Sequence, residues 1–381
     1  MYPISVIIRT TRTNTKRGKG LKSNYEPIGN FIQPIDERNG NLRDLPLVGL
    51  SITKEFIPSI ANTIGTDMTS YRIIRRNQFA YSGVTSRNSD KITIALFSDY
   101  DEALISQAYT PFFVTDENKL NPEYLMMWFR RPEFDRYARF KSHGSAREIF
   151  DWDDLCETLI PVPKIETQRA IVAEYNALQN RININQKIIQ KLEETAQAIY
   201  KEWFVENVDL ENLPDGWKIG TLEDLYHFQY GLGNINPDNG GKYPVYGSNG
   251  IIGGYDEFNN EDAPVIGHIG ANCGSVVFAW GKHFVTYNGV MCIVKEKSSK
   301  WFSYITLLEK DLMSQTRGSS QPFVSYDMLY EIPTVIPNIE SIKKFNSIVE
   351  KMFTVLMLKS QENQKLNEFK TLLLSKLASV E

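Results

Sequence analysis

The chain has 381 residues, 42% of them hydrophobic and 23% charged, with a formal net charge of −4. These values are ordinary for a globular protein, and the length allows two or three domains with cores of their own. Three cysteines without a C-x-x-C and four scattered histidines argue against a disulfide framework and a zinc cluster. No apolar run is long enough for a membrane-spanning helix and the first residues lack an apolar signal segment, so we expect a soluble, cytoplasmic protein.

The negative net charge conceals a more basic first part of the chain. Residues 1–164 contain 22 Lys and Arg against 20 Asp and Glu, whereas the remainder contains 20 against 26. Positive charge concentrates in residues 9–22, 72–91 and 130–147. Each cluster can be a solvated surface, but phosphate binding needs local rather than net charge. Residues 1–24 are interpreted as a flexible basic arm before a first domain.

The first domain, residues 25–164, has the pattern of a mixed α/β fold with one well-marked helix. LNPEYLMMWFRR (120–131) indicates a helix capped by Asn121, with Pro122 at its first position. The same stretch, Asn121-Pro-Glu-Tyr124, differs by one residue from the N-P-P-Y motif with which adenine methyltransferases hold a flipped base. Because a helix cap explains the stretch fully, we favour the cap.

A long helix is predicted after this domain. IPVPKIETQRAI (160–171) places two prolines before a stretch that meets no Pro or Gly until Pro214 and Gly216. Pro is tolerated at a helix entrance but costs about 3 kcal/mol in its interior. Within the predicted helix, residues 165–206, a heptad seam alternates steps of three and four. Its members are Ile171, Tyr175, Leu178, Ile182, Asn185, Ile189, Leu192, Ala196, Ile199 and Trp203.

A C-terminal helix is predicted at residues 339–381, and it carries a second seam. Each position of this seam follows its counterpart in the first seam by the same number of residues, the spacing between Ile171 and Phe345. Its apolar members are Phe345, Val349, Met352, Leu356, Leu366, Leu373 and Leu377, interrupted by Lys359, Asn363 and Lys370. Because another domain (207–338) lies between the two helices in sequence, helix pairing would have to be antiparallel, with a spacer of roughly 57 Å. Asn185 either fixes the register or is a tolerated polar residue.

The same offset relates the segments that precede the helices. GSAREIFDWDDL (144–155) aligns with GSSQPFVSYDML (318–329), and Pro163-Lys-Ile-Glu-Thr aligns with Pro337-Asn-Ile-Glu-Ser. Short β runs and Gly/Asn turns in YPVYGSNGIIGGYDEF (243–258) and APVIGHIGANCGSVVF (263–278) predict a twisted sheet with long loops. The expected fold is therefore a tandem repeat of two mixed α/β domains, separated by two long antiparallel coiled-coil helices.

The sequence offers little that resembles a catalytic centre. It has no G-x-x-x-x-G-K-[ST] motif and no recognisable nuclease motif, and Gly231-Leu-Gly233 is better explained as a turn. Gly267-His-Ile-Gly-Ala-Asn-Cys-Gly274 could cradle a phosphate, but no helix pattern follows it. A strand–turn–strand arrangement is the better interpretation.

The loops of both domains instead combine glycine with side chains suited to base recognition. Arg matches the O6/N7 edge of guanine, and Asn or Gln matches the N6/N7 edge of adenine. Any one of these residues could simply form a turn or a buried polar contact, but they recur in matched loops. The candidate DNA-binding residues are Arg72, Arg75, Arg76, Tyr81, Arg87, Arg147, Asn249, Asn272 and Gln321.

This layout resembles the specificity (S) subunits of type I restriction–modification enzymes. The resemblance rests on GSAREIF followed by IPVPKIETQRAIV, the helix end Ala198-Ile-Tyr-Lys-Glu-Trp-Phe204 and the domain entry Leu213-Pro-Asp-Gly-Trp-Lys218. YPVYGSNGIIG and VIGHIGANCGSV are similar to the target-recognition domains of that family. The resemblance covers residues 25–381.

Membership of this family would imply two domains that each read half of a split, asymmetric DNA site. The helices would act as the ruler between the halves and as the docking surface for two methyltransferase (M) subunits. Those partners bind S-adenosylmethionine and methylate a flipped adenine, while restriction (R) subunits use ATP and Mg²⁺. This chain itself would hold no cofactor or metal and catalyse nothing. Two other hypotheses stay open: a stand-alone adenine-N6 methyltransferase, and a coiled-coil scaffold without a DNA role.

Overall fold

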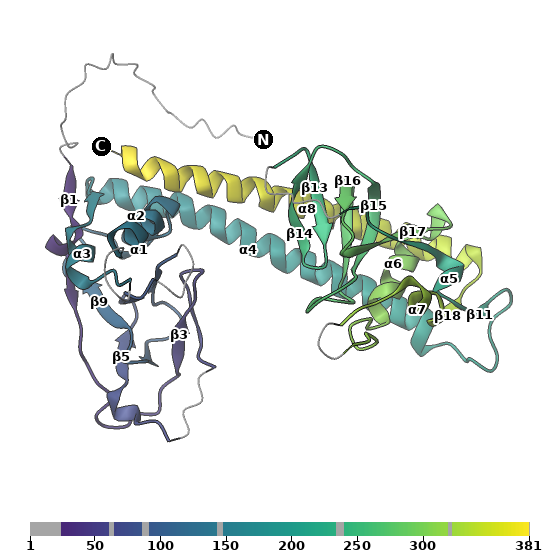
Figure 1. Ribbon diagram of the computed structural model, residues 1–381, viewed down its shortest axis with the longest axis horizontal. Coiled ribbons are helices and arrows are strands. Elements are labelled where there is room, and N and C mark those ends of the chain that lie inside the picture. Colours follow the sequence, from purple (N-terminus) through teal and green to yellow (C-terminus); the bar gives the residue numbers. More distant parts are fainter. Residues whose placement is uncertain are drawn as a thin grey trace, which may run out of the picture. The chain divides into compact units, whose positions relative to one another are not determined.

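A computed structural model describes residues 24–60, 65–85, 91–142, 148–233, 240–318 and 322–380. The chain divides into two compact units, 1–180 with 366–381, and 181–365. Each unit consists of one mixed α/β domain and the portions of the two long helices that pack against it (Figure 1). The prediction of mixed α/β domains with long helices is therefore confirmed.

The first unit is built on a four-stranded antiparallel sheet. Its strands lie in the order β2 (Ile32–Pro34), β9 (Thr110–Val114), β6 (Phe79–Ser82) and β7 (Thr93–Leu96). Two-stranded pairs accompany it: β1 (Tyr25–Pro27) with β10 (Leu159–Pro161), β3 (Val48–Leu50) with β4 (Phe56–Pro58), and β5 (Arg72–Arg75) with β8 (Glu102–Ile105). The helices are η1 (Ile28–Asn30), η2 (Met68–Ser70), α1 (Pro122–Phe129), α2 (Pro132–Ser142) and α3 (Trp152–Glu157).

Aromatic packing joins this sheet to α1. Phe79 stacks on Phe112 with ring centres 4.9 Å apart, and Phe129 of α1 meets Phe79 edge-on at 5.8 Å. Helix α1 starts as predicted, because the Asn121 Oδ1 accepts a hydrogen bond from the Tyr124 N–H at 3.0 Å. The helix-cap interpretation of Asn121-Pro-Glu-Tyr124 is thus confirmed.

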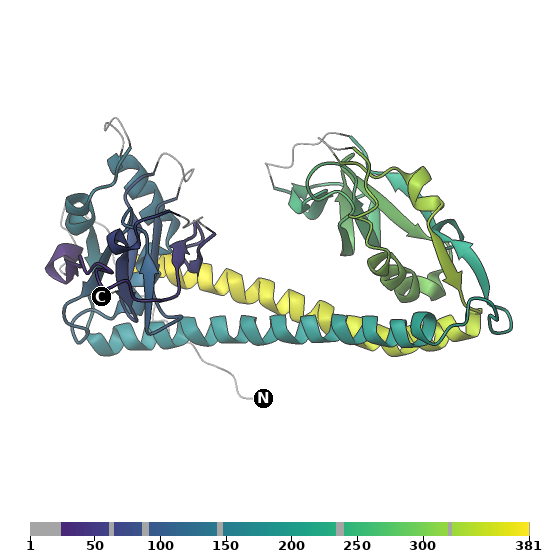
Figure 2. The ribbon, with the colours of Figure 1, turned by 90° about the horizontal axis from the view of Figure 1, so that it is seen from below.

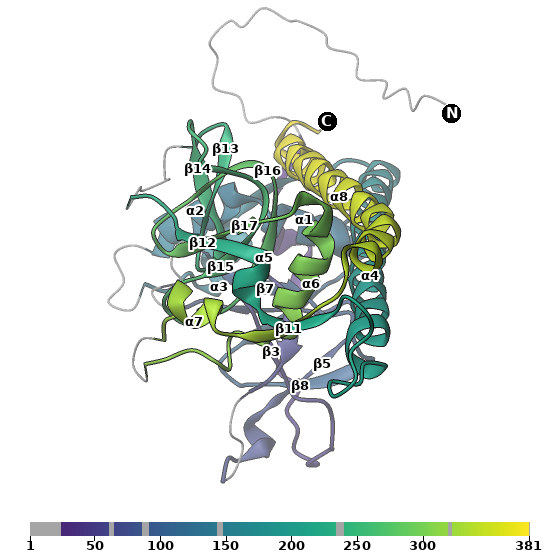
Figure 3. The same cartoon turned by 90° about the vertical axis from the view of Figure 1, so that its right-hand side faces the viewer.

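The second unit contains a six-stranded sheet. Its order is β12 (Tyr226–Tyr230), β17 (Gly289–Val294), β15 (Asn260–Gly267), β16 (Val276–Val285), β13 (Tyr243–Gly247) and β14 (Gly250–Tyr255), and only the β13–β16 pairing is parallel. β11 (Lys218–Thr221), labelled in Figure 3, pairs with β18 (Pro333–Ile336), which Figure 1 labels beside it. The helices are α5 (Leu222–Leu225), η4 (Lys297–Ser299), α6 (Lys300–Glu309) and α7 (Tyr326–Tyr330). Residues 267–274 join β15 to β16, which confirms the strand–turn–strand interpretation.

The long helices are α4 (Ile165–Lys201), which ends in the π-helical turn η3 (Glu202–Glu206), and α8 (Ile339–Lys376), followed by η5 (Leu377–Ser379) (Figure 2). They pair antiparallel, as predicted. In the second unit the ring centres of Tyr200 and Phe345 lie 6.1 Å apart, and Asn185 Nδ2 donates to Asn363 Oδ1 at 2.9 Å. Asn185 is fully buried. The polar residue in the seam of α4 is therefore paired with one specific polar residue of α8, Asn363.

The buried face of α4 departs from the predicted heptads toward its C-terminal end. Tyr200 and Phe204 are 4% and 3% exposed, whereas Ile199 and Trp203 are only half-buried. A straight α-helix repeats every 3.6 residues, so its buried face moves away from a strict 3.5-residue seam. Tyr200 and Phe204 also contact Phe302 of α6. The end of α4 therefore packs into the second domain as well as against α8.

Backbone contacts repeat between the two domains. The Ile28 N–H donates to the Thr158 carbonyl at 2.9 Å, and the Leu222 N–H donates to the Ile332 carbonyl at the same distance. Thr158 and Ile332 are separated by the offset that relates the two seams in the sequence. The same short antiparallel pair closes each domain, β1 with β10 and β11 with β18.

Each long helix also holds a short helix of its domain through a side-chain amide. The buried Gln168 of α4 accepts a hydrogen bond from the Asn121 N–H at 2.8 Å, at the start of α1. Asn346 of α8 accepts one from the Phe302 N–H at 2.9 Å, near the start of α6. These anchors satisfy backbone donors that a helix start leaves unpaired. Among the described helices, none combines the length and apolar composition needed to cross a membrane.

Candidate nucleic-acid interface

Each domain presents two loops that meet through their backbones, and we call these the loop pair of that domain. In the second domain the loop pair consists of residues 267–275 and 317–325, of which 319–321 lie outside the described residues. The Val324 N–H donates to the His268 carbonyl at 3.0 Å, and the Gly270 N–H donates to the Pro322 carbonyl at 3.0 Å. The two loops are thus fixed to one another.

The first domain has the same connection between residues 83–85 and 148–150. The Phe150 N–H donates to the Gly83 carbonyl at 2.8 Å, and Val84 forms a β-bridge with Ile149. In the second domain the corresponding bridge joins Ile269 to Phe323. Ile149 and Phe323 are again separated by the offset of the repeat, so the repeat places the same loop contact in both domains.

Two of the predicted DNA-binding residues come together beside the second loop pair. Asn272 Nδ2 donates to Asn249 Oδ1 at 2.7 Å, and both side chains are exposed. Asn249 lies in the turn between β13 and β14, while Asn272 lies in the loop between β15 and β16. Ser248 ties that turn down, because its Oγ donates to the Asn288 carbonyl at 2.7 Å. The structure therefore places two amide side chains on an anchored surface.

An aromatic cluster lies next to this loop pair. The ring centre of Tyr230 is 4.4 Å from that of His268 and 4.7 Å from that of Tyr326. Tyr287, 51% exposed, meets His268 edge-on at 5.7 Å. Partial burial raises the pKa of Tyr230, so its hydroxyl stays protonated and can donate a hydrogen bond. Exposed tyrosine beside amides offers stacking and hydrogen bonding, the interactions that suit nucleic acid.

Sequence reasoning did not single out these aromatic residues, although Tyr230 and Tyr287 both precede glycine-containing turns. It also did not single out Arg317, which is exposed at the start of the second loop. Within the described part of the chain, its guanidinium has no carboxylate partner, which leaves its charge available for a phosphate or a guanine.

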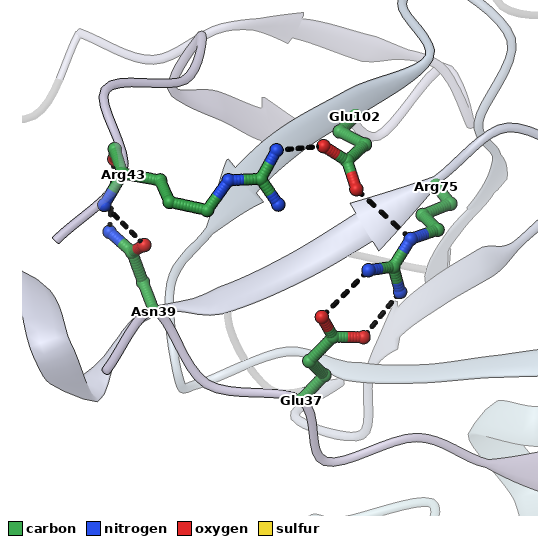
Figure 4. A network of polar contacts seen from close by, with 5 residues as sticks. All are labelled: Glu37, Asn39, Arg43, Arg75 and Glu102. Carbon is green, nitrogen blue, oxygen red and sulfur yellow. Dashed lines mark hydrogen bonds and ion pairs between the residues drawn. The ribbon is translucent and has the colours of Figure 1, made fainter. Parts of the chain in front are cut away.

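The arginines predicted in the first domain lie in a different setting. Arg75 faces both carboxylate oxygens of Glu37, with Nη2–Oε1 at 2.7 Å, and its Nε donates to Glu102 at 3.0 Å (Figure 4). Glu102 also accepts from Arg43, whose backbone N–H donates to Asn39 Oδ1 at 2.9 Å (Figure 4). Hydrogen bonds from the arginines hold the pKa values of Glu37 and Glu102 below their usual range.

The neighbouring arginines are paired in the same way. Arg72 Nε donates to Asp36 at 2.9 Å, and Arg76 Nη2 lies 3.2 Å from Asp101. These side chains join the loop at 36–43 and the 98–102 region to β5, so the positive charge seen at 72–76 in the sequence is offset by carboxylates. A DNA contact by Arg72, Arg75 or Arg76 stays a prediction.

Tyr81 is a correction to the predicted interface. Its side chain is 3% exposed in the core of the first domain, and its ring lies 6.2 Å from Phe112 and 6.3 Å from Trp152. A side chain buried in this way cannot reach a base. Tyr81 lies in β6, where successive side chains point to opposite faces of the sheet, and its position turns it toward the core. The sequence suggested an exposed loop because Gly83 follows closely. Arg87, Arg147 and Gln321 lie outside the described residues.

The structure has two mixed α/β domains, each packed against its portions of the paired helices. Residues 214–375 match the family model of the type I restriction modification DNA specificity domain. The chain is 27% identical over 160 residues to the HindI specificity subunit of Haemophilus influenzae, an alignment that covers 40% of this chain and 34% of that protein. It is 21% identical over 294 residues to the MjaIX specificity subunit of Methanocaldococcus jannaschii, covering 67% of this chain and 68% of that one.

A solved structure shares the fold. The crystal structure of the type I restriction–modification S subunit from M. genitalium superposes with a TM-score of 0.53 at 17% identity, covering 94% of this chain and 98% of that chain. By these matches, the chain is similar to the specificity subunits of type I restriction–modification systems, and residues 214–375 carry the match to their DNA specificity domain. The curated relatives are specificity subunits, in agreement with the prediction of a chain without a catalytic centre of its own.

Proposed function

We propose that this chain reads a bipartite, asymmetric DNA target, one half-site with each domain. The observation that carries the proposal is the loop pair. Its backbone connection recurs in both domains, while the side chains around it differ. The repeated backbone connection would place the loops in the same way in both domains, while different side chains would contact different bases. This arrangement suits the reading of two unlike half-sites, because side chains contact the base edges.

The paired helices would serve as the ruler between the half-sites. Helix α4 contains 37 residues, which corresponds to about 56 Å at 1.5 Å per residue. The buried Asn185–Asn363 pair supports a defined register, since a polar residue at a seam position disfavours shifted pairings. We further propose that the outer helix faces dock two methyltransferase subunits and that restriction subunits complete the assembly.

In this assembly the chemistry would reside in the partners. S-adenosylmethionine would bind the methyltransferase subunits, and ATP and Mg²⁺ the restriction subunits, with the complex acting in the cytoplasm. The side chain that would have to hold a flipped base here, Asn121, is committed to capping α1. This favours a positioning role for the chain over the stand-alone methyltransferase hypothesis.

Methylation mapping tests the proposed function. The chain would be expressed with its methyltransferase subunits in a host lacking other modification systems, and modified adenines located by single-molecule sequencing. We expect one split motif with two unlike halves and a fixed gap. In parallel, the purified complex should bind a duplex containing that motif more tightly than a scrambled duplex, with affinity falling as salt rises. Equal binding of both duplexes would instead support the scaffold hypothesis.

A further inference from the structure

The Asn249–Asn272 hydrogen bond uses only part of the hydrogen-bonding capacity of the Asn249 amide. Asn272 donates through Nδ2 to Asn249 Oδ1 at 2.7 Å. An amide oxygen has a second lone pair and an amide nitrogen carries two N–H groups. Asn249 therefore keeps one acceptor site and both of its donors. If both amides were turned over, Asn249 would donate to Asn272 and keep one N–H together with its oxygen, so either arrangement leaves Asn249 with a donor and an acceptor for a ligand.

We propose that Asn249 reads an adenine in the major groove of the half-site bound by the second domain, and that Asn272 is the positioning residue that orients its amide. This rests on the proposed function. In the major groove adenine presents an N7 acceptor beside N6–H donors, guanine two acceptors, cytosine a donor, and thymine an acceptor beside a methyl group. A single amide with one donor and one acceptor thus makes two hydrogen bonds to adenine alone.

The turn that carries Asn249 is held in place before any ligand arrives. Besides its bond to Asn288, Ser248 accepts a hydrogen bond through its carbonyl from Ser275 Oγ at 3.4 Å. Gly267 allows the loop of Asn272 to pass close by, because a Cβ at that position would lie 2.5 Å from the Asn272 carbonyl oxygen. A reading side chain on an anchored turn loses less conformational entropy on binding than one on a free loop.

The surroundings suit a nucleic-acid edge. Asn249 and Asn272 are both exposed, so their mutual bond competes with water and contributes little to folding on its own. The loop of Asn272 is the one that pairs with the loop of Arg317, through Gly270 and Pro322. An arginine without a carboxylate partner among the described residues is therefore available on the adjoining loop for the phosphate backbone, which would set the register of the amide on the bases.

The test is a selection of binding sites from a random duplex library, using the full chain assembled with its methyltransferase subunits. The key variant is Asn249→Asp, which keeps the shape but replaces the donor with an acceptor. We expect one position of one half-site to lose its preference for adenine by a factor on the order of 5–150. Cytosine, which offers an N4–H donor, should gain there. Asn272→Ala should weaken the adenine preference at the same position without changing its identity.

The other half-site and a matched variant are the controls. Asn212→Asp makes the same chemical change at an exposed asparagine outside the loop pair, and should leave every position unchanged. If Asn249→Asp selects the wild-type half-site, or loses preference at all of its positions together, the assignment is overturned. If the wild-type complex selects no sequence at all, the proposed function fails, an outcome clearly different from an unchanged half-site.

Discussion

The two domains connect their backbones alike but stabilise them with different side chains. In the first, a buried Lys54–Asp135 ion pair at 2.7 Å and the Arg75 network hold loops to the sheet and to α2. In the second, a stacked aromatic pair joins the domain to a long helix: Trp301 of α6 stacks on Phe353 of α8 with ring centres 4.3 Å apart.

This difference indicates that the two copies of the repeat share their backbone connections more closely than the types of side chain around them. The bridges Val84–Ile149 and Ile269–Phe323 keep the loop pair in both domains, whereas the Arg75 network lies in the first domain and the Tyr230–His268–Tyr326 cluster lies in the second. The side chains around a loop pair can therefore change while the backbone connection between its two loops is kept. Under the proposed function, that separation would allow the two half-sites to differ.

The largest effect is expected when both long helices are lengthened together, because this tests whether they set the spacing between the two half-sites. Insertion of four residues near Gln186 and near Ser360 adds about 6 Å and turns the far end by roughly 40° beyond a full turn. One base pair of duplex adds about 3.4 Å and roughly 36°. We expect two unchanged half-sites separated by one or two additional base pairs, as measured by methylation mapping. An altered half-site at the original gap would show that the helices are not the ruler.

The charged interior of the first domain should make it sensitive to a single substitution. Lys54 and Asp135 have side-chain exposures of 5% and 12%. Lys54→Met should lower the free energy of unfolding of this domain by about 3–5 kcal/mol, because Asp135 loses the partner of its buried charge. Hydrogen exchange of β6 peptides measures the loss, and β15 peptides of the second domain serve as the control. Equal loss in both would mean that the domains do not respond separately.

Substitution of a predicted base-contact residue should affect the half-site bound by its own domain and leave the other half-site unchanged. Arg147→Ala and Gln321→Ala should each weaken binding of a cognate duplex by about 1–3 kcal/mol, each at one half-site. Arg75→Ala, which removes the guanidinium that joins Glu37 to Glu102 in Figure 4, tests the predicted DNA contact of the first domain in the same assay: a change of base preference confined to that domain's half-site would support it. Fluorescence anisotropy with duplexes altered in one half at a time gives the comparison. Unchanged cognate-to-scrambled ratios would make Arg147 or Gln321 structural.

The two helix anchors offer a matched pair of smaller effects. Gln168→Ala leaves the Asn121 N–H without its acceptor, and Asn346→Ala does the same to the Phe302 N–H. A buried donor without a partner costs about 1–3 kcal/mol. We expect each variant to reduce hydrogen-exchange protection in its own domain. Destabilisation of the opposite domain by either variant would contradict a local anchoring role.

The smallest effect concerns an ion pair between the helices in the second unit. Hydrogen bonds from Arg181 and Lys359 lower the pKa of Glu362 to about 2. Its folded pKa is below the unfolded value, so the stabilisation is complete above about pH 4.5 and is lost as the pH falls toward 2. Because these side chains are partly exposed, we expect less than about 1 kcal/mol. Thermal unfolding of Glu362→Gln should differ from wild type most at pH 6, less at pH 3, and least near pH 2, where the folded-state carboxylate becomes protonated.

Sequence alone determined the long helices and the repeat. An entrance at Pro163, the absence of Pro and Gly over the following residues and a periodic apolar face are local features, and a helix depends mostly on local features. The constant offset between the two halves likewise needed no structure, since two copies of one fold keep the same spacing between their loops and helices. The strand–turn–strand at 267–274 followed from turn residues without a helix pattern after them.

Tertiary structure decided which side chains are available at the surface. Tyr81 turned inward and Arg75 met Glu37 and Glu102, residues 38 and 27 positions away in the chain. Asn249 met Asn272 because β13 and β15 lie in the same sheet. Composition and spacing carry no information on such partners, since burial and charge pairing depend on what the fold brings from a distance. The sequence shows where polar and basic side chains gather in the loops, and the packing around them determines which of these side chains stay exposed.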